Sequence, residues 1–236
     1  MKPGIAAALL PERPYLVPID RRELLPFRVR LAESTQDIHK AVEIRAAAYA
    51  RHIPEMGAAL REPESDDLRD DALLLLAEGK LDRDVVGSLR LQPNFNRPLR
   101  IEGEVSLPES HRGRRLVEAR RLGVDNGSSG RMVMVALVKA AFELCHASGI
   151  DFVVVAGRRS VATMYRTMLF DDVLGGATID LSYAESLPHS VFSMPVADAD
   201  RRWRTTRHGL YDFMARTEHP DIAIDYDRVF AAFGQP

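Results

Sequence analysis

The first part of the chain changes from alternating to helical hydrophobic spacing. Apolar and charged residues alternate in FRVRLAES, residues 27–34, which predicts a strand with one buried face. Ser34 then opens a capping-box pattern, and apolar positions recur along one helical face at Ile38, Val42, Ala46 and Tyr49. We therefore expect a strand followed directly by a half-buried helix.

Later segments carry more continuous apolar runs. ALLLLAE (72–78) and VVGSLRLQ (85–92) flank a polar turn that contains glycine, which predicts a β-hairpin. A connection that contains proline leads to further predicted elements: a strand at 116–124, a long helix between Gly130 and Gly149, a buried strand at 150–157, a short helix at 160–170 and a last strand at 190–196.

This order of elements indicates the fold class. Three strands follow one another without crossover helices, which argues against a doubly wound parallel sheet. We expect a mixed α/β protein, α+β in its connections, with a twisted mixed sheet flanked by helices on both faces. Residues 1–26 are rich in proline and are expected to form an N-terminal arm, residues 27–196 the main domain, and residues 197–236 a C-terminal helical extension.

Composition and charge exclude several classes of protein. The chain has 236 residues, of which 46% are hydrophobic and 28% charged, as is ordinary for a globular protein. A net charge of −2 gives no overall attraction to nucleic acid or to an anionic membrane. The single cysteine, Cys145, excludes a disulfide framework and a cysteine-based metal cluster, and we predict no metal site. No apolar run approaches the roughly 20 residues of a membrane span, so we expect a cytoplasmic protein.

The predicted strand at 116–124 contains charges that are unusual for a buried strand: Glu118, Arg120 and Arg121. Glu118 and Arg121 are three positions apart, so they point to opposite faces of a regular strand unless a β-bulge redirects one of them. Buried guanidinium groups need partners. We expect Arg90, Arg121 and Glu118 to lie in one polar network, with Asp67 or Asp70 at its edge. This network could be either a substrate site or a structural scaffold.

The order of the charged residues resembles one family of enzymes. Arg45 lies in the first predicted helix, an acidic pair follows that is best matched by Asp67 and Asp70, Arg90 lies in the hairpin, and Glu118 and Arg121 form a Glu-x-x-Arg motif. With the strand–glycine–helix–strand order after residue 116, this set resembles the GNAT acyltransferases. Within them it is most similar to the branch of N-acyl amino acid synthases and acyl-homoserine-lactone synthases. The resemblance covers residues 28–196 and implies a GNAT acyl-CoA N-acyltransferase-like fold.

The resemblance also implies an activity. Such an enzyme would move a fatty acyl group from a phosphopantetheine thioester, on acyl carrier protein or CoA, to the α-amine of an amino acid. The thioester is a co-substrate, and no permanently bound cofactor is expected. The tryptophan expected near the first helix of lactone synthases is missing, since Trp203 lies far downstream, which favours an amino acid over S-adenosylmethionine as acceptor. The alternatives are a lactone synthase, a short-chain CoA-dependent acetyltransferase and a catalytically silent module that binds acyl groups or carrier protein.

Candidate roles follow for individual residues. Glu118 would accept the amine proton, the backbone amide near Val124 would stabilise the oxyanion, and Tyr165 would protonate the leaving thiolate, as the resemblance implies. Substrate binding, including bidentate orientation of a carboxylate, would fall to the charged set: Arg45, Asp67, Asp70, Arg90 and Arg121.

The loop DNGSSGRM replaces the phosphate loop of ordinary GNAT enzymes. Its candidate phosphate-binding residues lie at a helix start: Asn126, Gly127, Ser128, Ser129, Gly130 and Arg131. A carrier-bound phosphopantetheine brings a single phosphate, so this reduced loop favours carrier protein over CoA as donor, although a plain turn is the alternative interpretation. We expect an acidic carrier protein to meet a basic patch formed by Arg112, Arg114, Arg115, Arg158 and Arg159.

Overall fold

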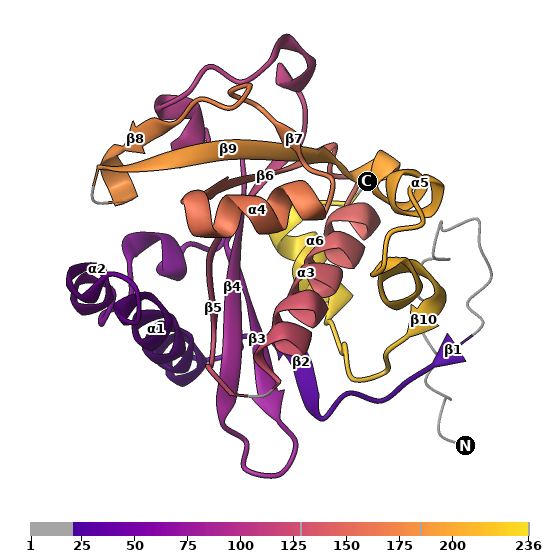
Figure 1. Cartoon of the computed structure of the whole chain (residues 1–236). Helices are drawn as coiled ribbons and strands as arrows, with labels where there is room; N and C mark the ends of the chain where they lie inside the picture. Colours follow the sequence, from indigo (N-terminus) through magenta and orange to yellow (C-terminus); the bar gives the residue numbers. More distant parts are fainter. Residues whose placement is uncertain (1–20, 128, 185, 236) are drawn as a thin grey trace.

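The computed structural model describes residues 21–127, 129–184 and 186–235, and a mixed eight-stranded sheet lies at its centre (Figure 1). The strand order is β2-β3-β4-β5-β6-β9-β7, with β8 paired to β9. The strands are β2 Phe27–Leu31, β3 Leu73–Gly79, β4 Val85–Pro93, β5 Leu116–Val124, β6 Phe152–Gly157, β7 Asp171–Asp172, β8 Ile179–Leu181 and β9 Leu187–Pro195. The mixed sheet and the predicted hairpin are confirmed.

Helices connect and cover these strands. The α-helices are α1 Thr35–Ala50, α2 Pro54–Ala59, α3 Gly130–Ala147, α4 Arg159–Thr167, α5 Ala199–Thr205 and α6 Tyr226–Phe233. Short 3-10 helices are η1 Ser65–Leu68, η2 Arg100–Gly103, η3 Glu109–His111, η4 Ser182–Ala184 and η5 Val196–Asp198, and η6 Asp212–Arg216 is a π-helical turn. Across the described ranges, none of these helices combines the length and apolar character needed to cross a lipid bilayer.

The sheet is buried on both faces, which explains the continuous apolar run of β3. Leu73 and Leu75 pack in the main core with α3, whereas Leu74 and Leu76 pack against α1 residues such as Ala41. Figure 1 accordingly shows α1 and α2 on one side of β4 and β5, with α3 on the other. The predicted cap of α1 is also present, because the Ser34 side chain accepts a hydrogen bond from the Asp37 amide.

Strands β5 and β6 are parallel but stay together over only part of their length. Cα pairs join Leu116–Glu118 to Phe152–Val154, and no later pair joins these two strands in the described structure. Beyond that point β6 continues to pair with β9 as far as Gly157. The prediction that β5 and β6 run parallel and separate towards their carboxyl ends is confirmed.

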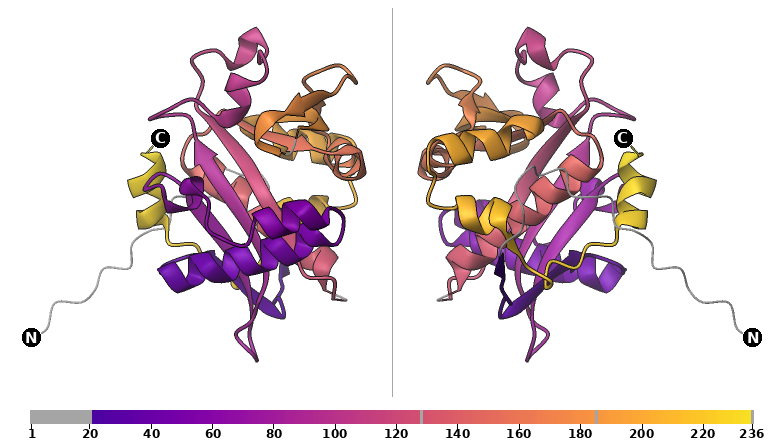
Figure 2. Two further views of the ribbon diagram at one scale, coloured as in Figure 1. Left: turned by 90° about the vertical axis from the view of Figure 1, so that its left-hand side faces the viewer. Right: turned by 90° about the vertical axis from the view of Figure 1, so that its right-hand side faces the viewer.

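The C-terminal segment packs on the α3 side of the sheet (Figure 2). Its strand β10 (Thr217–Glu218) pairs in parallel with β1 (Arg21–Arg22), and the Val29 backbone bonds to Asp221 and Ala223. The buried Lys139 ammonium on α3 donates to the carbonyl oxygens of Phe213 and Thr217. Residues 197–236 therefore contribute buried side chains to the main hydrophobic core. Of the expected N-terminal arm, residues 1–20 lie outside the described part of the chain.

Candidate active site

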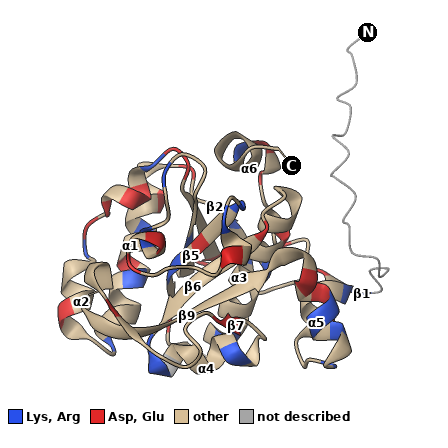
Figure 3. Ribbon diagram, turned by 90° about the horizontal axis from the view of Figure 1, so that it is seen from above, with Lys and Arg blue, Asp and Glu red and all other residues tan. Residues whose placement is uncertain are grey.

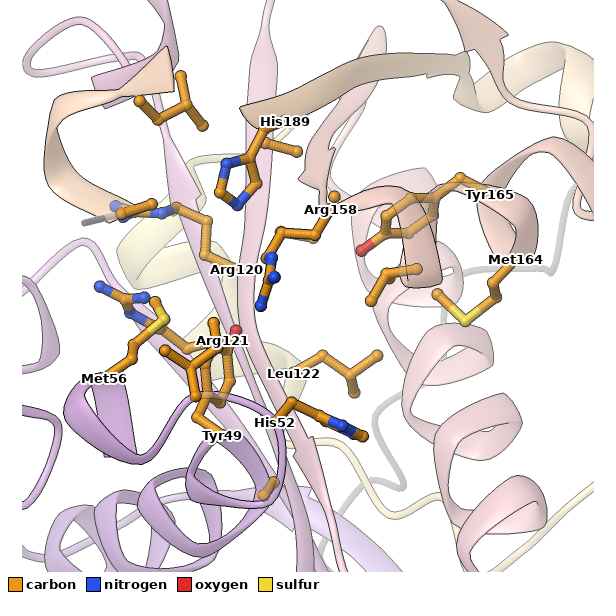
Figure 4. A pocket seen from close by; sticks show the side chains of 18 of the residues that line it. Tyr49, His52, Met56, Arg120, Arg121, Leu122, Arg158, Met164, Tyr165 and His189 are labelled. Carbon is orange, nitrogen blue, oxygen red and sulfur yellow. The ribbon is translucent and has the colours of Figure 1, made fainter. Parts of the chain in front are cut away.

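A cavity of about 410 Å³ lies where β5 and β6 separate (Figure 4). Its walls come from α1, α2, the second half of β5, the end of β6, α4 and the segment from β8 to β9. Side chains that line it include Tyr49, Arg51, His52, Met56, Glu118, Arg120, Arg121, Leu122, Val124, Arg158, Val161, Met164, Tyr165, Tyr183 and His189. The lining is mainly apolar. Three of its charged residues, Glu118, Arg120 and Arg121, lie on β5, and Arg51 and Arg158 lie outside it.

A β-bulge explains how β5 brings three charged residues to this cavity. Arg90 pairs with Arg120 and Ser88 pairs with Gly123, so Leu89 alone faces two residues of β5. The first of these is Arg121, which adopts a left-handed backbone with φ of 56°. The bulge redirects the Arg121 side chain to the face that already carries Glu118 and Arg120. Of the two predicted possibilities, opposite faces or a bulge, the structure has the bulge.

Glu64, which the sequence analysis did not select, is at the centre of the ion-pair network. Its carboxylate accepts hydrogen bonds from Arg121 Nε at 2.8 Å and Nη2 at 2.7 Å, and from Arg90 Nη1 at 3.0 Å. Desolvation by itself would raise the pKa of Glu64. The neighbouring guanidinium groups of Arg121, Arg90 and Arg45 outweigh it and lower this pKa to about 2.

Asp67 lies deeper in the same network. It binds Arg45 through two hydrogen bonds, of 2.7 and 2.9 Å, and accepts another from Arg90 at 2.8 Å. Burial opposes ionisation, but these two guanidinium groups lower the pKa of Asp67. The structure thus brings together Arg45, Arg90 and Asp67, three of the residues expected to bind substrate, and that role stays a prediction.

Of the two acids expected at the edge of the network, Asp67 or Asp70, the structure places Asp67 there and not Asp70. The side chain of Asp70 is exposed, and the acid that accompanies Asp67 is Glu64 instead. The 3-10 helix η1 turns Glu64 and Asp67 to the same side, and the Asp67 carboxylate accepts from the Glu64 amide at 2.8 Å. The missed signal was the three-residue spacing of these two acids across a short turn.

Glu118 is almost completely buried at the cavity wall. It receives hydrogen bonds from the Tyr183 hydroxyl at 3.2 Å and the Ile101 amide at 3.4 Å, and it lies 3.4 Å from Arg120 Nε. Burial raises the pKa of its carboxyl group, and the positive charge of Arg120 opposes this shift only in part. A carboxyl group with a raised pKa at a cavity is suited to act as a general base, because its carboxylate binds a proton more tightly than an ordinary one.

Arg120 connects Glu118 to the remaining charges. Its Nη1 lies 3.5 Å from Asp66, and Asp66 lies 3.8 Å from Arg90 Nη2. The predicted network of Glu118, Arg90 and Arg121 is therefore confirmed, with Arg120, Asp66 and Glu64 as its connecting members. Tyr183, which also contacts Glu118, gave no recognisable signal in the sequence.

Tyr165 and Val124 both line the cavity. The ring of Tyr165 packs so closely on Gly157 that a Cβ there would lie 2.8 Å from the ring, and burial raises the pKa of the Tyr165 hydroxyl. The Val124 carbonyl accepts from Arg51 Nη2 at 2.6 Å. Because β6 has left β5 before this point, backbone groups on that edge of β5 face the cavity. The roles of Tyr165 and of the Val124 amide stay predictions.

The predicted phosphate loop lies at the start of α3, and Ser128 falls outside the described residues. Two of its amides bond within the loop, since Asn126 donates to the Asp125 carboxylate at 2.7 Å and Gly130 donates to the Gly127 carbonyl at 3.0 Å. The described loop residues, including Ser129 and Arg131, border a separate hollow or solvent and do not line the cavity. Phosphate binding by this loop stays a prediction.

The five arginines expected to form one basic patch do not do so. Arg112 and Arg114 precede β5, and Arg115 donates to the carbonyls of Ser148 and Phe233. Arg158 and Arg159 follow β6, at the opposite end of these parallel strands. The single-patch prediction is therefore wrong, because distance along the sequence did not reveal the direction of the strands. Figure 3 shows basic residues on α4 and α5.

The parallel strands that separate around a cavity, with a buried glutamate on one of them, define an acyltransferase of the GNAT fold. The model of the family described as N-acyl amino acid synthase FeeM matches residues 40–185. Because this match spans more than half of the chain, the protein belongs to that family, and it is an N-acyltransferase. No curated protein sequence matches the chain.

Solved structures agree on the fold. FeeM, an N-acyl amino acid synthase from uncultured soil microbes, is 14% identical with a TM-score of 0.59, over 80% of this chain and 98% of FeeM. BjaI, a CoA-dependent acyl-homoserine lactone synthase solved with SAM and isopentyl-CoA, is 16% identical with a TM-score of 0.54, over 87% of this chain and 98% of BjaI. A probable acetyltransferase from Staphylococcus epidermidis is 14% identical with a TM-score of 0.52, over 72% and 98% of the two chains. At these identities the likeness shows the GNAT fold, as predicted.

Proposed function

We propose that the protein transfers a fatty acyl group from the phosphopantetheine thioester of acyl carrier protein to the α-amine of an amino acid. The observation that carries this proposal is Glu118, a buried carboxyl group with a raised pKa beside a largely apolar cavity. Membership of the N-acyl amino acid synthase family supports the same acceptor class.

In the proposed reaction, the neutral amine attacks the thioester carbonyl carbon and a C–N bond forms. Glu118 takes the proton that the amine nitrogen loses. Backbone N–H groups on the free edge of β5 near Val124 stabilise the oxyanion of the tetrahedral intermediate. The C–S bond then breaks, and Tyr165 donates a proton to the thiolate. The ion network of Glu64 and Asp67 keeps the bulged strand rigid while these steps occur.

Arginines at the start of α4 support a donor with an anionic arm. Arg158 lines the cavity and Arg159, the next residue, is exposed. We propose that Arg158 meets the phosphopantetheine phosphate and that Arg159 meets the acidic surface of the carrier protein. Such attraction accelerates encounter and weakens as salt is added.

The test is to offer a saturated C12 acyl chain on carrier protein or on CoA, with a mixture of the common amino acids, and to identify products by mass spectrometry. We expect an N-acyl amino acid, formed faster from carrier protein. Formation of a lactone from S-adenosylmethionine, or no product with any amine, would contradict the proposed function.

Two charge reversals test the donor separately. Arg159→Glu should slow transfer from carrier protein at low salt and leave transfer from CoA almost unchanged. The matched control is Arg112→Glu, because Arg112 is also exposed but lies at the other end of β5 and β6. Equal effects of the two reversals, or a clear preference for CoA, would contradict carrier protein as the donor.

A further inference from the structure

The arginines predicted to bind a substrate carboxylate are already occupied by the protein's own acids. Arg45 and Arg90 are held by Asp67 and do not line the cavity in the described structure. Arg121 lines the cavity, but Glu64 holds both its Nε and its Nη2 at 2.8 and 2.7 Å. A carboxylate that entered the cavity would have to displace Glu64 to reach Arg121.

Arg120 differs from these three arginines in two respects together, its longer distances to carboxylates and its place on the cavity wall. Its nearest carboxylate oxygens, on Glu118 and Asp66, lie at 3.4 and 3.5 Å, beyond the usual distance of a charge-assisted hydrogen bond. Its side chain is only 6% exposed, and its Nη2 has no hydrogen-bond partner among the described residues. A buried guanidinium with an unused donor is costly unless a ligand completes it. Arg120 also lines the cavity (Figure 4).

The surroundings of Arg120 fit an amino acid. Glu118 and Arg120 are two positions apart on β5 and point to the same face, with Cα atoms roughly 6.6 Å apart from the rise of a strand. An α-amino acid carries its amine and carboxylate on one carbon, so both groups can reach this pair at once. The Tyr183 ring lies under the Arg120 guanidinium at 4.2 Å and holds its plane, while the N–H edge stays available for a planar carboxylate.

We propose that Arg120 binds the α-carboxylate of the acceptor and thereby selects amino acids over amines that lack this group. The assignment rests on the proposed function, because it names the acceptor subsite of the same cavity. Arg120 is a specificity-determining residue beside the base Glu118. It orients the amine towards Glu118 by holding the neighbouring carboxylate.

The first test uses the unaltered protein with phenylalanine and phenylalaninamide as acceptors and a C12 acyl thioester as donor. Rates are compared per neutral amine, because the two amines differ in pKa. A charge-assisted hydrogen bond predicts kcat/KM about 10- to 100-fold higher for the acid than for the amide. Equal values for the two acceptors would overturn the assignment.

The second test compares Arg120→Gln with Arg100→Gln. Arg100 also pairs with Asp66, at 2.9 Å, and faces the Tyr183 ring at 5.9 Å, but it does not line the cavity. We expect Arg120→Gln to remove the preference for the acid and Arg100→Gln to retain it, which a merely structural role of Arg120 would not produce. If Arg158→Gln removes the preference while Arg120→Gln keeps it, the carboxylate subsite belongs to Arg158 and the assignment is wrong.

Binding measured by calorimetry tests the role of Arg120 even if the proposed function is wrong. If no amine receives an acyl group, the proposed function fails, and binding of phenylalanine against phenylalaninamide still tests the subsite. We expect tighter binding of the acid to the unaltered protein and to Arg100→Gln, but not to Arg120→Gln. The same binding measurement serves if Arg120→Gln folds but is inactive. If Arg120→Gln does not fold, equal binding of acid and amide to the unaltered protein alone overturns the assignment.

Discussion

Glu64 joins two neighbouring strands, because its carboxylate binds Arg90 of β4 and Arg121 of β5. The backbone of Arg121 adopts a left-handed conformation, which is unfavourable for a residue other than glycine. Its ion pair with Glu64 compensates for this strain and keeps the bulge in place. The strand that carries Glu118 is thus shaped in part by Glu64.

Glu64→Gln should therefore destabilise the protein strongly at neutral pH, by about 3–5 kcal/mol, as is typical when one partner of a buried ion pair is removed. The measurement is chemical unfolding, with Glu62→Gln as control because Glu62 is exposed. A loss no larger than that of the control would contradict the central position of Glu64.

The pH dependence of this loss follows from the lowered pKa of Glu64. The folded pKa is about 2, below the ordinary value of 4.5, so the carboxylate stabilises the fold fully above pH 4.5. This contribution disappears as the pH falls from 4.5 towards 2. The difference in unfolding free energy between the unaltered protein and Glu64→Gln should shrink over the same interval, and a constant difference would contradict the assigned pKa.

At the scale of elements, the position of α1 against β5 depends on Gly123. A Cβ at this residue would lie 2.8 Å from the Arg45 Cα, so the helix backbone itself would have to move. Gly123 therefore allows the approach that brings Arg45 to Asp67 and forms one wall of the cavity.

We expect Gly123→Ala to destabilise the protein by about 1–3 kcal/mol, as overpacking typically does. It should also lower activity, because α1 carries Tyr49 at the cavity and Arg51 follows at the end of the helix. The control is Gly103→Ala in η2, where an added Cβ would meet nothing within 4 Å. Thermal unfolding and acyl-transfer rates are measured for both variants. If Gly123→Ala is as stable and as active as Gly103→Ala, the close packing of α1 on β5 is not required.

The sequence predicted the elements with strong periodicity and missed those formed by tertiary pairing. The hairpin β3–β4 and helices α1 and α3 follow from long apolar patterns. Strands β1 and β10 span two residues each and exist only because they pair with each other, so no local signal marks them. The site was predicted to a similar extent. Glu118 and Arg121 stood out as charges in an apolar strand. Glu64, Asp66 and Tyr183 lie in or next to short 3-10 helices within polar connections, where such residues are ordinary.

At the scale of the whole molecule, the C-terminal segment is joined to the core by buried contacts. Lys139 bonds to the carbonyls of Phe213 and Thr217, and the Trp203 indole packs against Phe142 and donates to the Met168 carbonyl. The Lys139 ammonium and the Trp203 indole are thus both buried between residues 197–236 and the rest of the protein.

A chain that ends at Val196 should therefore fail to unfold cooperatively, because Lys139 loses these carbonyl partners and α3 is uncovered. Removing only the last three residues, after Phe233, should leave the unfolding transition nearly unchanged and is the matched control. A cooperative transition near that of the full chain, measured by heating, would show that residues 197–236 are dispensable.

The proposed function depends above all on Glu118, which is proposed to accept the proton in acyl transfer to an amino acid. The most direct measurement is kcat/KM for the unaltered protein and for Glu118→Gln across a range of pH, with unfolding curves to show that both are folded. We expect the variant to keep its fold and lose activity about 10²-fold or more. The unaltered protein should gain activity as the pH rises through the raised pKa of Glu118, a dependence absent from the variant. A folded Glu118→Gln protein with full activity and the same pH profile would contradict Glu118 as the proton acceptor.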